Sequence, residues 1–398
     1  MNRRNIVLLY AARAARGLGD GFAVIILPAY LAEIGFDAFQ IGLVATAALL
    51  GTAIATLAVG VLGARHDLRN LLLVGASLMA ATGFAFATVD HLVIVVLIAF
   101  IGTMNPATGD LGVVVPLEHA MIATSVTDGD RTRVFAHYSL VGALATAAGA
   151  LAAAAPDLMQ SLGLGKITAL QVMFYAYAAL GVVSAALYAQ LPHAELKAAT
   201  PAAALGPSRG IVYKLSALFS LDSFAGGFAV PSLIALWLFE RFDLSLTAAS
   251  LFFFWSNVLT AFSYPVAARL AARVGLVNTM VFTHIPSSLC LIAAAFTPNL
   301  TLVLALLLIR SALSQMDVPT RTSYVMAVVT PAERAAAASF TAVPRSLASA
   351  VSPVMAGALL ATSFATLPLI LCGGLKIVYD LLLLVMFRTV KPPEETPP

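Results

Sequence analysis

The chain has 398 residues, of which 61% are hydrophobic and only 10% are charged, and its mean hydropathy is +0.96. A soluble globular protein carries about a quarter charged residues, so this composition excludes that class and indicates a protein of the lipid bilayer. A net charge of +3 is too small to indicate a nucleic-acid partner. Cys290 and Cys372 are isolated in apolar runs, which predicts packing residues rather than a disulfide framework or a metal site.

The chain begins with an apolar segment that has a basic start, MNRRNIVLLYAARAARGLGDGF. Arg13, Arg16 and Asp20 interrupt the apolar stretch, and no clean cleavage site follows it. We therefore predict a retained first membrane helix rather than a signal peptide. Gly17, Gly19 and Gly21 follow no strand, so they indicate close helix packing rather than a nucleotide-binding loop.

The rest of the chain divides into apolar segments of membrane-spanning length. A transmembrane helix needs about 20 mostly apolar residues, and charges, Pro, Gly and Asn separate such runs here. The runs are too long for strands and show no alternation of period two. We predict an all-α polytopic membrane protein with twelve spans, approximately at 6–32, 41–62, 71–88, 92–124, 134–155, 169–191, 213–239, 247–268, 277–296, 300–328, 335–361 and 367–388.

The basic residues outside the spans predict the orientation. With the N-terminus inside, most of these Lys and Arg residues fall in cytoplasmic segments, and the external loops hold only Lys166 and Arg241. This asymmetry places both termini in the cytoplasm of a cell inner (plasma) membrane, and an even number of spans agrees with it.

The two halves of the chain resemble each other. GFAVIILPAYLAEIGFDAFQIG from Gly21 aligns with GFAVPSLIALWLFERFDLSLTA from Gly227, and TDGDRTR from Thr127 aligns with TPAERAA from Thr330. A polar, proline-containing stretch separates the halves. We predict a six-helix half at 1–191, a cytoplasmic linker at 192–212, a second six-helix half at 213–388 and a cytoplasmic tail at 389–398.

Two homologous six-helix halves joined by a cytoplasmic linker resemble the major facilitator superfamily of secondary transporters. Its usual loop after the second span, G-x-L-a-D-R-x-G-R-[RK], is similar to GVLGARHDLR from Gly60, with Ala64 in place of the family's aspartate. The resemblance implies alternating access about a cavity lined by spans 1, 4, 7 and 10. It also implies gating loops, for which the candidates are Gly60, Arg65, Asp67, Arg69, Asp130, Arg131, Glu333 and Arg334.

Charged residues inside the spans must be paired or face water, because each costs about 2.5–3.5 kcal/mol at a helix centre. Three pairs of opposite charge lie four residues apart on one helix face: Arg16 and Asp20, Asp317 and Arg321, and Lys376 and Asp380. Such pairs either neutralise each other structurally or line a substrate path, and the spacing leaves both readings open.

The tenth predicted span carries a polar stripe, which indicates a face turned to the protein interior or a cavity. The stripe steps by four, three, four and three residues through Arg310, Ser314, Asp317, Arg321 and Tyr324. The candidates for contact with substrate are Arg16, Arg310, Asp317, Arg321, Arg345, Asn105, Gln315 and Tyr324.

Three acids are the candidates for proton coupling: Asp110, Asp222 and Asp20. Asp110 and Asp222 have no oppositely charged residue one helical turn away, and Asp110 aligns with Asp317 in the repeat. A lone acid in a low-dielectric setting can bind and release a proton near neutral pH. The alternative is a carboxylate that is paired with an arginine of another helix, such as Arg310 or Arg345.

Other polar residues within the spans carry weaker predictions. We expect Glu118 and His119 to contact the loop that contains Asp130 and Arg131. His137, Tyr138 and His284 are single polar groups on apolar helices, and we interpret them as packing residues. Several prolines predict bent or broken helices, namely Pro28, Pro106, Pro116, Pro231 and Pro319.

These features predict a secondary active transporter of a small polar or amphiphilic solute, and efflux by proton antiport is the prediction from the family. The alternatives are a proton-coupled uptake symporter or an organic-anion exchanger, which the intramembrane arginines suit equally well. An enzyme is not expected because no nucleophile–base or metal constellation is present, and no cofactor is expected. A non-transporting membrane sensor is a further alternative. We expect protons and a small-molecule substrate as partners, and a monomer in the lipid bilayer.

Overall fold

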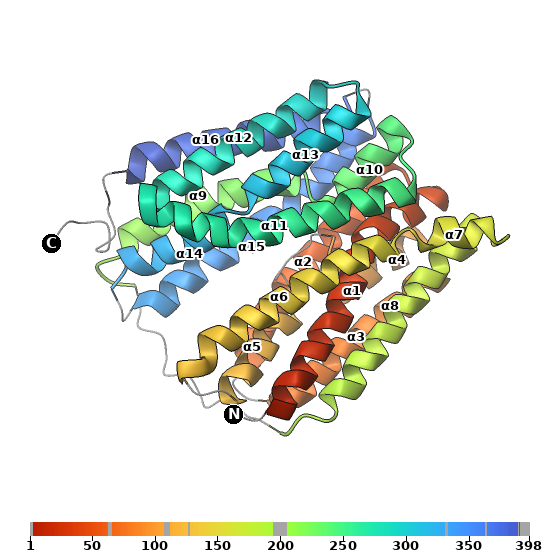
Figure 1. Ribbon diagram of the computed structural model, residues 1–398, viewed down its shortest axis with the longest axis horizontal. Coiled ribbons are helices and arrows are strands. Elements are labelled where there is room, and N and C mark those ends of the chain that lie inside the picture. The colour runs from red at the N-terminus through yellow and green to blue at the C-terminus, as the bar shows by residue number, and fades with distance from the viewer. Residues whose placement is uncertain are drawn as a thin grey trace. The chain divides into compact units, whose positions relative to one another are not determined.

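The computed structural model describes residues 3–62, 66–106, 112–125, 128–193, 205–330, 333–362, 364–388 and 390. Over these residues the chain forms helices joined by turns and short connections (Figure 1). The all-α fold predicted from the sequence is confirmed.

The backbone clusters into two compact units. Unit 1 comprises Met1–Ala199 and Val230–Asn257, and unit 2 comprises Thr200–Ala229 and Val258–Pro398. Unit 1 contains α1 (Arg3–Glu33), α2 (Ala38–Leu62), α3 (Leu68–Thr88), α4 (Leu92–Ile101), α5 (Val114–Ser125), α6 (Asp128–Ala152), α7 (Ala155–Ser161), α8 (Lys166–Tyr188), α10 (Pro231–Phe242) and the first part of α11 (Leu246–Val274). Unit 2 contains α9 (Arg209–Gly227), the rest of α11, α12 (Leu276–Phe296), α13 (Leu300–Ser314), α14 (Asp317–Val328), α15 (Arg334–Leu360) and α16 (Leu367–Phe387).

The helices coincide with the predicted spans. Within the described residues, 11 segments are long and apolar enough to cross a membrane, and Leu92–Ile101 is a shorter apolar helix in the position of the fourth span. The short helix α7 was not expected. It carries Pro156 in its first turn, where a missing N–H is tolerated. Large apolar side chains remain exposed on many of the helices, as a lipid-facing surface requires.

Three of the predicted spans are interrupted near prolines or polar residues. The fourth span is split into α4 and α5, the seventh into α9 and α10, and the tenth into α13 and α14. Pro231 occupies the first turn of α10, whereas Pro28 lies inside α1, which continues through it. The backbone N–H of Ser232 donates to the carbonyl of Pro106 at 3.3 Å, so two of these interruptions meet within unit 1.

In unit 1, α1 packs against α6 and α8, and α3 packs against α8 (Figure 1). The core beside this contact contains Leu9, Leu72, Met121, Tyr138 and Tyr188, all of them buried. In unit 2, α9 packs against α15 and α16, and α12 packs against α13, α14 and α16. These contacts bring the polar residues of several helices in each unit toward one another.

Glycines allow α1 and α6 to approach closely, as the sequence predicts for the glycines of the first span. A Cβ atom at Gly21 would collide with the carbonyl oxygen of Thr146, and a Cβ at Gly149 would collide with the carbonyl oxygen of Leu18. Both obstacles are backbone atoms, which cannot rotate away as a side chain can. The two helices therefore contact each other nearly backbone to backbone.

Replacement of Gly149 by Val is expected to destabilise unit 1 by about 1–3 kcal/mol, because the added atoms force α1 and α6 apart. The thermal unfolding midpoint in detergent would measure the change. Gly374→Ala in α16 is the matched control, since a Cβ there meets nothing within 4 Å. An unchanged midpoint for Gly149→Val would contradict the close contact.

Candidate functional site

A buried ionic cluster in unit 1, here called the Glu118 cluster, joins four helices. It contains Arg16 of α1, Glu118 of α5, Tyr138 of α6 and Tyr188 of α8. Arg16 forms a salt bridge with Glu118, and the hydroxyl of Tyr138 also donates to this carboxylate. Tyr188 donates to Glu118 Oε1 at 2.6 Å and accepts from Arg16 Nε at 3.1 Å. The side chain of Glu118 is 0% exposed, so a carboxylate is fully buried here with its partners around it.

The Glu118 cluster corrects one expectation from the sequence. Arg16 was paired with Asp20 by helical spacing, but the structure gives it Glu118 as its salt-bridge partner. The spacing of Glu118 from Arg16 is 102 residues, and a pattern search within one helix cannot find such a pair. The expected contact of Glu118 with the loop of Asp130 and Arg131 stays a prediction, because those side chains lie outside the described residues.

A small cavity of about 20 Å³ adjoins this cluster in unit 1. It is lined on the polar side by Arg13, Arg16, Asp20, Thr103, Asn105 and Tyr177. Tyr177 donates to Asp20 Oδ1 at 3.4 Å. A volume of this size holds about one water molecule. Asp20 and Asn105, both candidates from the sequence, thus line one small cavity with Arg16.

A second buried network lies in unit 2 and is here called the Asp222 network. It contains Asp222 of α9, His284 of α12, Asp317 and Arg321 of α14, and Lys376 and Asp380 of α16. Lys376 Nζ donates to Asp222 Oδ1 at 2.6 Å, and Arg321 Nη1 donates to Asp222 Oδ2 at 3.1 Å. Arg321 Nη1 also lies 3.0 Å from Asp317 Oδ2. Asp222 is therefore a carboxylate between two cations.

His284 extends this network to Asp380. His284 Nδ1 lies 3.0 Å from Asp380 Oδ1, and His284 Nε2 lies 3.2 Å from Lys376 Nζ. The other oxygen of Asp380 is buried and has no hydrogen-bond partner among the described residues. The ring of His284 thus connects an incompletely paired carboxylate to the cation that holds Asp222.

The Asp222 network contains two of the ion pairs that helical spacing predicted, and the structure confirms one of them. Asp317 and Arg321 form the expected pair. Lys376 and Asp380 instead have Asp222 and His284 as their partners. His284, interpreted as a packing residue, is 2% exposed and belongs to the network. The sequence left open whether Asp222 is paired, and the structure pairs it with cations of α14 and α16 rather than with Arg310 or Arg345.

The two clusters are related by the internal repeat with their charges reversed. Asp222 occupies the position in the second half that Arg16 occupies in the first, as the alignment of Gly21 with Gly227 shows. In unit 1 the cation Arg16 on α1 meets the acid Glu118 on α5. In unit 2 the acid Asp222 on α9 meets the cation Arg321 on α14. Both bridges thus connect the first helix of a half to the second segment of an interrupted span.

The remaining cavity candidates in unit 2 lie apart from these direct contacts. The predicted stripe is not on one continuous helix, because Gln315 and Met316 separate α13 from α14. The hydroxyl of Tyr324 donates to the carbonyl of Val390 at 3.0 Å, toward the C-terminal end of α16. Within the part of the chain that the structure describes, no carboxylate lies within salt-bridge distance of Arg310 or Arg345.

The predicted gating loop of the first half is tied to the end of α8. Asp67 caps α3 by accepting from the backbone N–H of Arg69 at 2.7 Å, and it also contacts the ring of His193. Arg69 Nη2 donates to the carbonyl of Ala189 at 2.6 Å. Burial alone would raise the pKa of the Asp67 carboxyl, but the hydrogen bonds from His193 and Arg69 outweigh it and lower the pKa below its usual range.

In the second half, Glu333 ties the start of α9 to the connection between α14 and α15. Its carboxylate accepts from the hydroxyls of Ser208 and Thr330 at 2.6 Å each and from the backbone N–H of Gly206. These hydrogen bonds lower the pKa of Glu333 to about 2. Arg334 donates from Nε to the carbonyl of Met326 at 3.1 Å.

Glu333→Gln is expected to lower the thermal unfolding midpoint at neutral pH, because the amide cannot accept all the hydrogen bonds that the carboxylate accepts. The folded pKa of Glu333 lies below the ordinary value of 4.5. Its stabilisation is therefore complete above about pH 4.5 and is lost as the pH falls toward about 2. The midpoint difference between the two proteins should shrink over that range. Glu33→Gln, which removes an exposed pair with Lys166, is the control and should change little.

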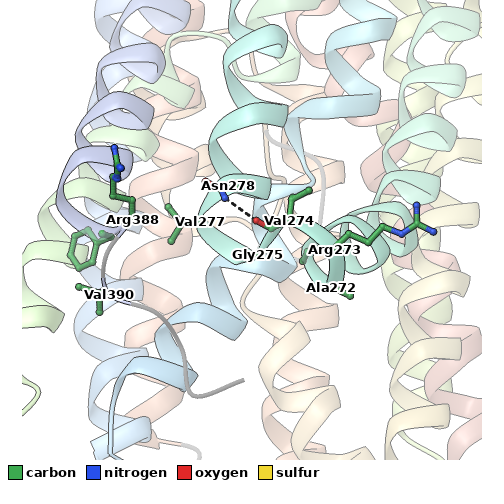
Figure 2. A pocket seen from close by; sticks show the side chains of 10 residues that line it. Ala272, Arg273, Val274, Gly275, Val277, Asn278, Arg388 and Val390 are labelled. Atoms are coloured by element: carbon green, nitrogen blue, oxygen red, sulfur yellow. Dashed lines mark hydrogen bonds between the residues drawn. The ribbon is translucent and has the colours of Figure 1, made fainter. Parts of the chain in front are cut away.

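Another cavity, of about 340 Å³, lies elsewhere in unit 2. Figure 2 shows it between the end of α11, the start of α12 and the end of α16, with Arg273 and Arg388 extending in different directions. Asn278 donates to the carbonyl of Val274 at 2.8 Å, which is the dashed line in the figure. Ala272 also lines this cavity. Both arginines are exposed, so the buried charge chemistry is in the Glu118 cluster and the Asp222 network.

Several sequence candidates fall outside what the structure describes. Asp110 and Arg65 lie outside the described residues, and so do the side chains of Asp130 and Arg131 and the surroundings of Gly60. Their predicted roles stay predictions. Over the described residues no group of three or more His, Cys, Asp or Glu side chains is placed to hold a metal ion.

Known proteins resemble this chain over nearly its whole length. The model of the family described as Major Facilitator Superfamily matches residues 9–220 and again residues 215–398. An uncharacterized membrane protein of Saccharomyces cerevisiae is 23% identical over 427 residues, which cover 97% of this chain and 95% of the yeast protein. The structure of the nucleoside transporter NupG superimposes with a TM-score of 0.75 at 15% identity and covers 98% of this chain and 100% of that chain. A D-xylose-proton symporter has a TM-score of 0.72 at 14% identity and covers 98% of each chain.

Proposed function

The chain belongs to the major facilitator superfamily and is a multi-pass membrane transporter, and we propose that it couples the movement of a small polar solute to the movement of protons. The family fold provides alternating access, in which the solute site opens to one side of the membrane at a time. We propose export from the cytoplasm across the inner membrane as the direction, with both termini cytoplasmic and the protein working as a monomer.

The Asp222 network is the observation that carries the proposal. Asp222, Asp317, Arg321 and Asp380 are buried charged residues within membrane-spanning helices. Ionisable residues are expensive in this setting and mark ion pathways and proton relays when they are present. Apolar side chains of similar size would stabilise a bundle at least as well as such a network. The network therefore fits a role in transport better than a role in folding.

Transport in proteoliposomes tests the proposal directly. The purified chain would be reconstituted, and pools of nucleosides, pentoses and organic acids would be offered with and without an imposed pH gradient. We expect one pool to move, and its movement to depend on the gradient. Flux of equal size with and without the pH gradient would exclude proton coupling. Absence of flux for all three pools would exclude the proposed class of solute.

Oriented vesicles decide the direction. A pH gradient that is acidic on the external side should drive an accepted solute out of the cytoplasmic compartment in an antiporter and into it in a symporter. We expect the antiport result. The assignment of Asp110, Asp222 and Asp20 to coupling predicts that Asn at these positions reduces gradient-driven flux, and full flux in all three variants would overturn it.

A second candidate function is proton-coupled uptake or exchange of an organic anion. It is favoured by Arg345 and Arg310, which lie on membrane helices without a carboxylate at salt-bridge distance in the described chain. Two guanidinium groups in this position suit a carboxylate or phosphate on the solute. Competition between the organic-acid pool and the neutral pools distinguishes this candidate from the first.

A further inference from the structure

We propose that the cavity of about 340 Å³ at the ends of α11, α12 and α16 binds the phosphate headgroup of an anionic phospholipid. Such a site lies at the surface of unit 2, away from the two buried ionic clusters. It is therefore independent of the solute, of the coupling ion and of the direction of transport.

The cavity lies where three membrane-spanning helices end. α11 ends at Val274, α12 begins at Leu276 and α16 ends at Phe387, and the cavity is lined by residues 271–278 of the first connection and by residues at the end of α16. All three segments are long and apolar enough to cross a membrane. Their ends lie at the boundary between the apolar core and the polar layer of the bilayer, which is the depth of the lipid phosphates.

Two cations line the cavity without an anion to neutralise them. Figure 2 shows Arg388 and Arg273 at its two sides, and both side chains are exposed. Within the described residues, no carboxylate lies at salt-bridge distance from either guanidinium group. Exposed side chains change rotamer within nanoseconds, so both groups can turn toward a phosphate between them. Arginine suits this ligand because its planar fork binds two phosphate oxygens at once.

The same end of unit 2 carries further exposed cations and, among the described residues, no exposed acid. Because consecutive spans alternate in direction, the starts of α9 and α15 lie at the same end as the cavity. The further exposed cations near these helix ends are Arg209, Lys214, Arg269 and Arg334. The acids described in unit 2 are all buried, namely Asp222, Asp317, Glu333 and Asp380. This end therefore has a positive field that attracts anionic headgroups.

Exposed apolar side chains extend from the cavity along two of its helices. On α12, Phe282 follows Asn278 of the cavity by one helical turn and is 62% exposed. On α16, Val385 lies three residues before Arg388 and is 75% exposed. Each apolar residue thus shares a helix face with a residue of the cavity. A phospholipid matches this arrangement, because its headgroup fills the polar cavity while its acyl chains cover the apolar faces. A free phosphate would use the cavity alone.

The volume and the charges of the cavity indicate the class of headgroup. About 340 Å³ lies within the range of about 300–1,000 Å³ for small-molecule sites, and it is far more than one water needs. A zwitterionic headgroup would bring an ammonium group close to Arg273 and Arg388, and like charges repel. A phosphate that carries a small neutral alcohol brings one negative charge and no positive one. Phosphatidylglycerol is a lipid of this class.

Titration with lipid tests the proposal. The purified full chain in detergent would be mixed with phosphatidylglycerol or with phosphatidylcholine, and bound lipid would be counted by native mass spectrometry. We expect saturable binding of phosphatidylglycerol and weaker binding of phosphatidylcholine. Each arginine near an anionic lipid contributes about fivefold in affinity. Arg273→Gln combined with Arg388→Gln should therefore weaken binding of phosphatidylglycerol by about 30-fold. Equal affinity of the native chain for the two lipids would overturn the proposal.

A second double variant separates the cavity from the general positive charge of this surface. Arg209→Gln combined with Lys214→Gln removes two exposed cations from α9, at positions that do not line the cavity. We expect this variant to bind phosphatidylglycerol as the native chain does. An equal loss of affinity in both double variants would show a diffuse attraction to the surface and would overturn the assignment to the cavity.

The native chain alone supplies a measurement that requires no variant and distinguishes the two sources of a phosphate. Phosphatidylglycerol should raise the thermal unfolding midpoint in detergent more than phosphatidylcholine does, because a ligand that binds only the folded chain stabilises it. Soluble glycerol phosphate should neither raise the midpoint nor displace the bound lipid. Displacement of the lipid by glycerol phosphate would mean that the cavity binds a soluble phosphate, and the lipid assignment would be wrong. None of these readouts depends on transport.

Discussion

Glu118→Ala is expected to destabilise unit 1 by about 3–5 kcal/mol, because it leaves the guanidinium of Arg16 buried without its acid. Arg16 is 6% exposed and receives its negative partner from α5. Loss of the carboxylate also removes the acceptor of the hydroxyls of Tyr138 and Tyr188. Urea or thermal unfolding in detergent, together with the yield of monodisperse protein, measures the effect.

A charge exchange provides the control for this prediction. Arg16→Asp combined with Glu118→Arg recreates in unit 1 the order that unit 2 already has in Asp222 and Arg321. We expect the double variant to recover part of the stability that either single change removes, because each buried charge again has an opposite partner. Equal instability of the single and double variants would show that the pair does not contribute through its charges.

The reversed charges of the two units have a consequence for function. The two bridges occupy related positions in the repeat, and among the described residues the bridge of unit 2 also contacts a lysine, a histidine and a second acid from α12 and α16. In unit 1 the corresponding neighbours of the bridge are two tyrosines, which do not change charge near neutral pH. Among the described residues, the bridge of unit 1 therefore has neutral hydroxyl partners, whereas the bridge of unit 2 has further charged ones.

The fold could be predicted from the sequence because its signal is local. A membrane helix is visible as about 20 consecutive apolar residues, and an interruption is visible as a nearby proline or polar group, as at Pro231. In the tenth span Pro319 predicted a bend or break, but the structure places the break ahead of it, at Gln315 and Met316. The polar residues of this span kept a helical spacing, so the stripe from Arg310 to Tyr324 was assigned to one helix.

The partners of the buried charges could be predicted only in part. Asp317 and Arg321 lie on one turn of α14, and their pairing follows from spacing. The pairs of Arg16 with Glu118 and of Lys376 with Asp222 join residues 102 and 154 positions apart. Such pairs depend on which helices pack together, and the apolar pattern of a membrane helix carries little information on its neighbours. His284 was missed for the same reason, since its partners are on other helices.

Asp222→Asn is expected to reduce gradient-driven transport by about 5–150-fold. The substitution leaves Lys376 without its carboxylate, whereas Arg321 keeps Asp317. Lys376 is then left without the acid that it contacts in the native chain, so the proposed coupling through Asp222 is lost. Exchange of solute without a gradient should be affected less than accumulation, which requires the coupling.

Asp317→Asn is the matched comparison for this last prediction. It removes one of the two acids of Arg321 but leaves Asp222 with both of its cations. We therefore expect Asp317→Asn to retain more accumulation than Asp222→Asn when both are measured in the same proteoliposomes. If the two variants lose accumulation equally, the contact between Lys376 and Asp222 contributes no more to coupling than the contact between Arg321 and Asp317. If Asp222→Asn accumulates solute as the native chain does, the network is structural.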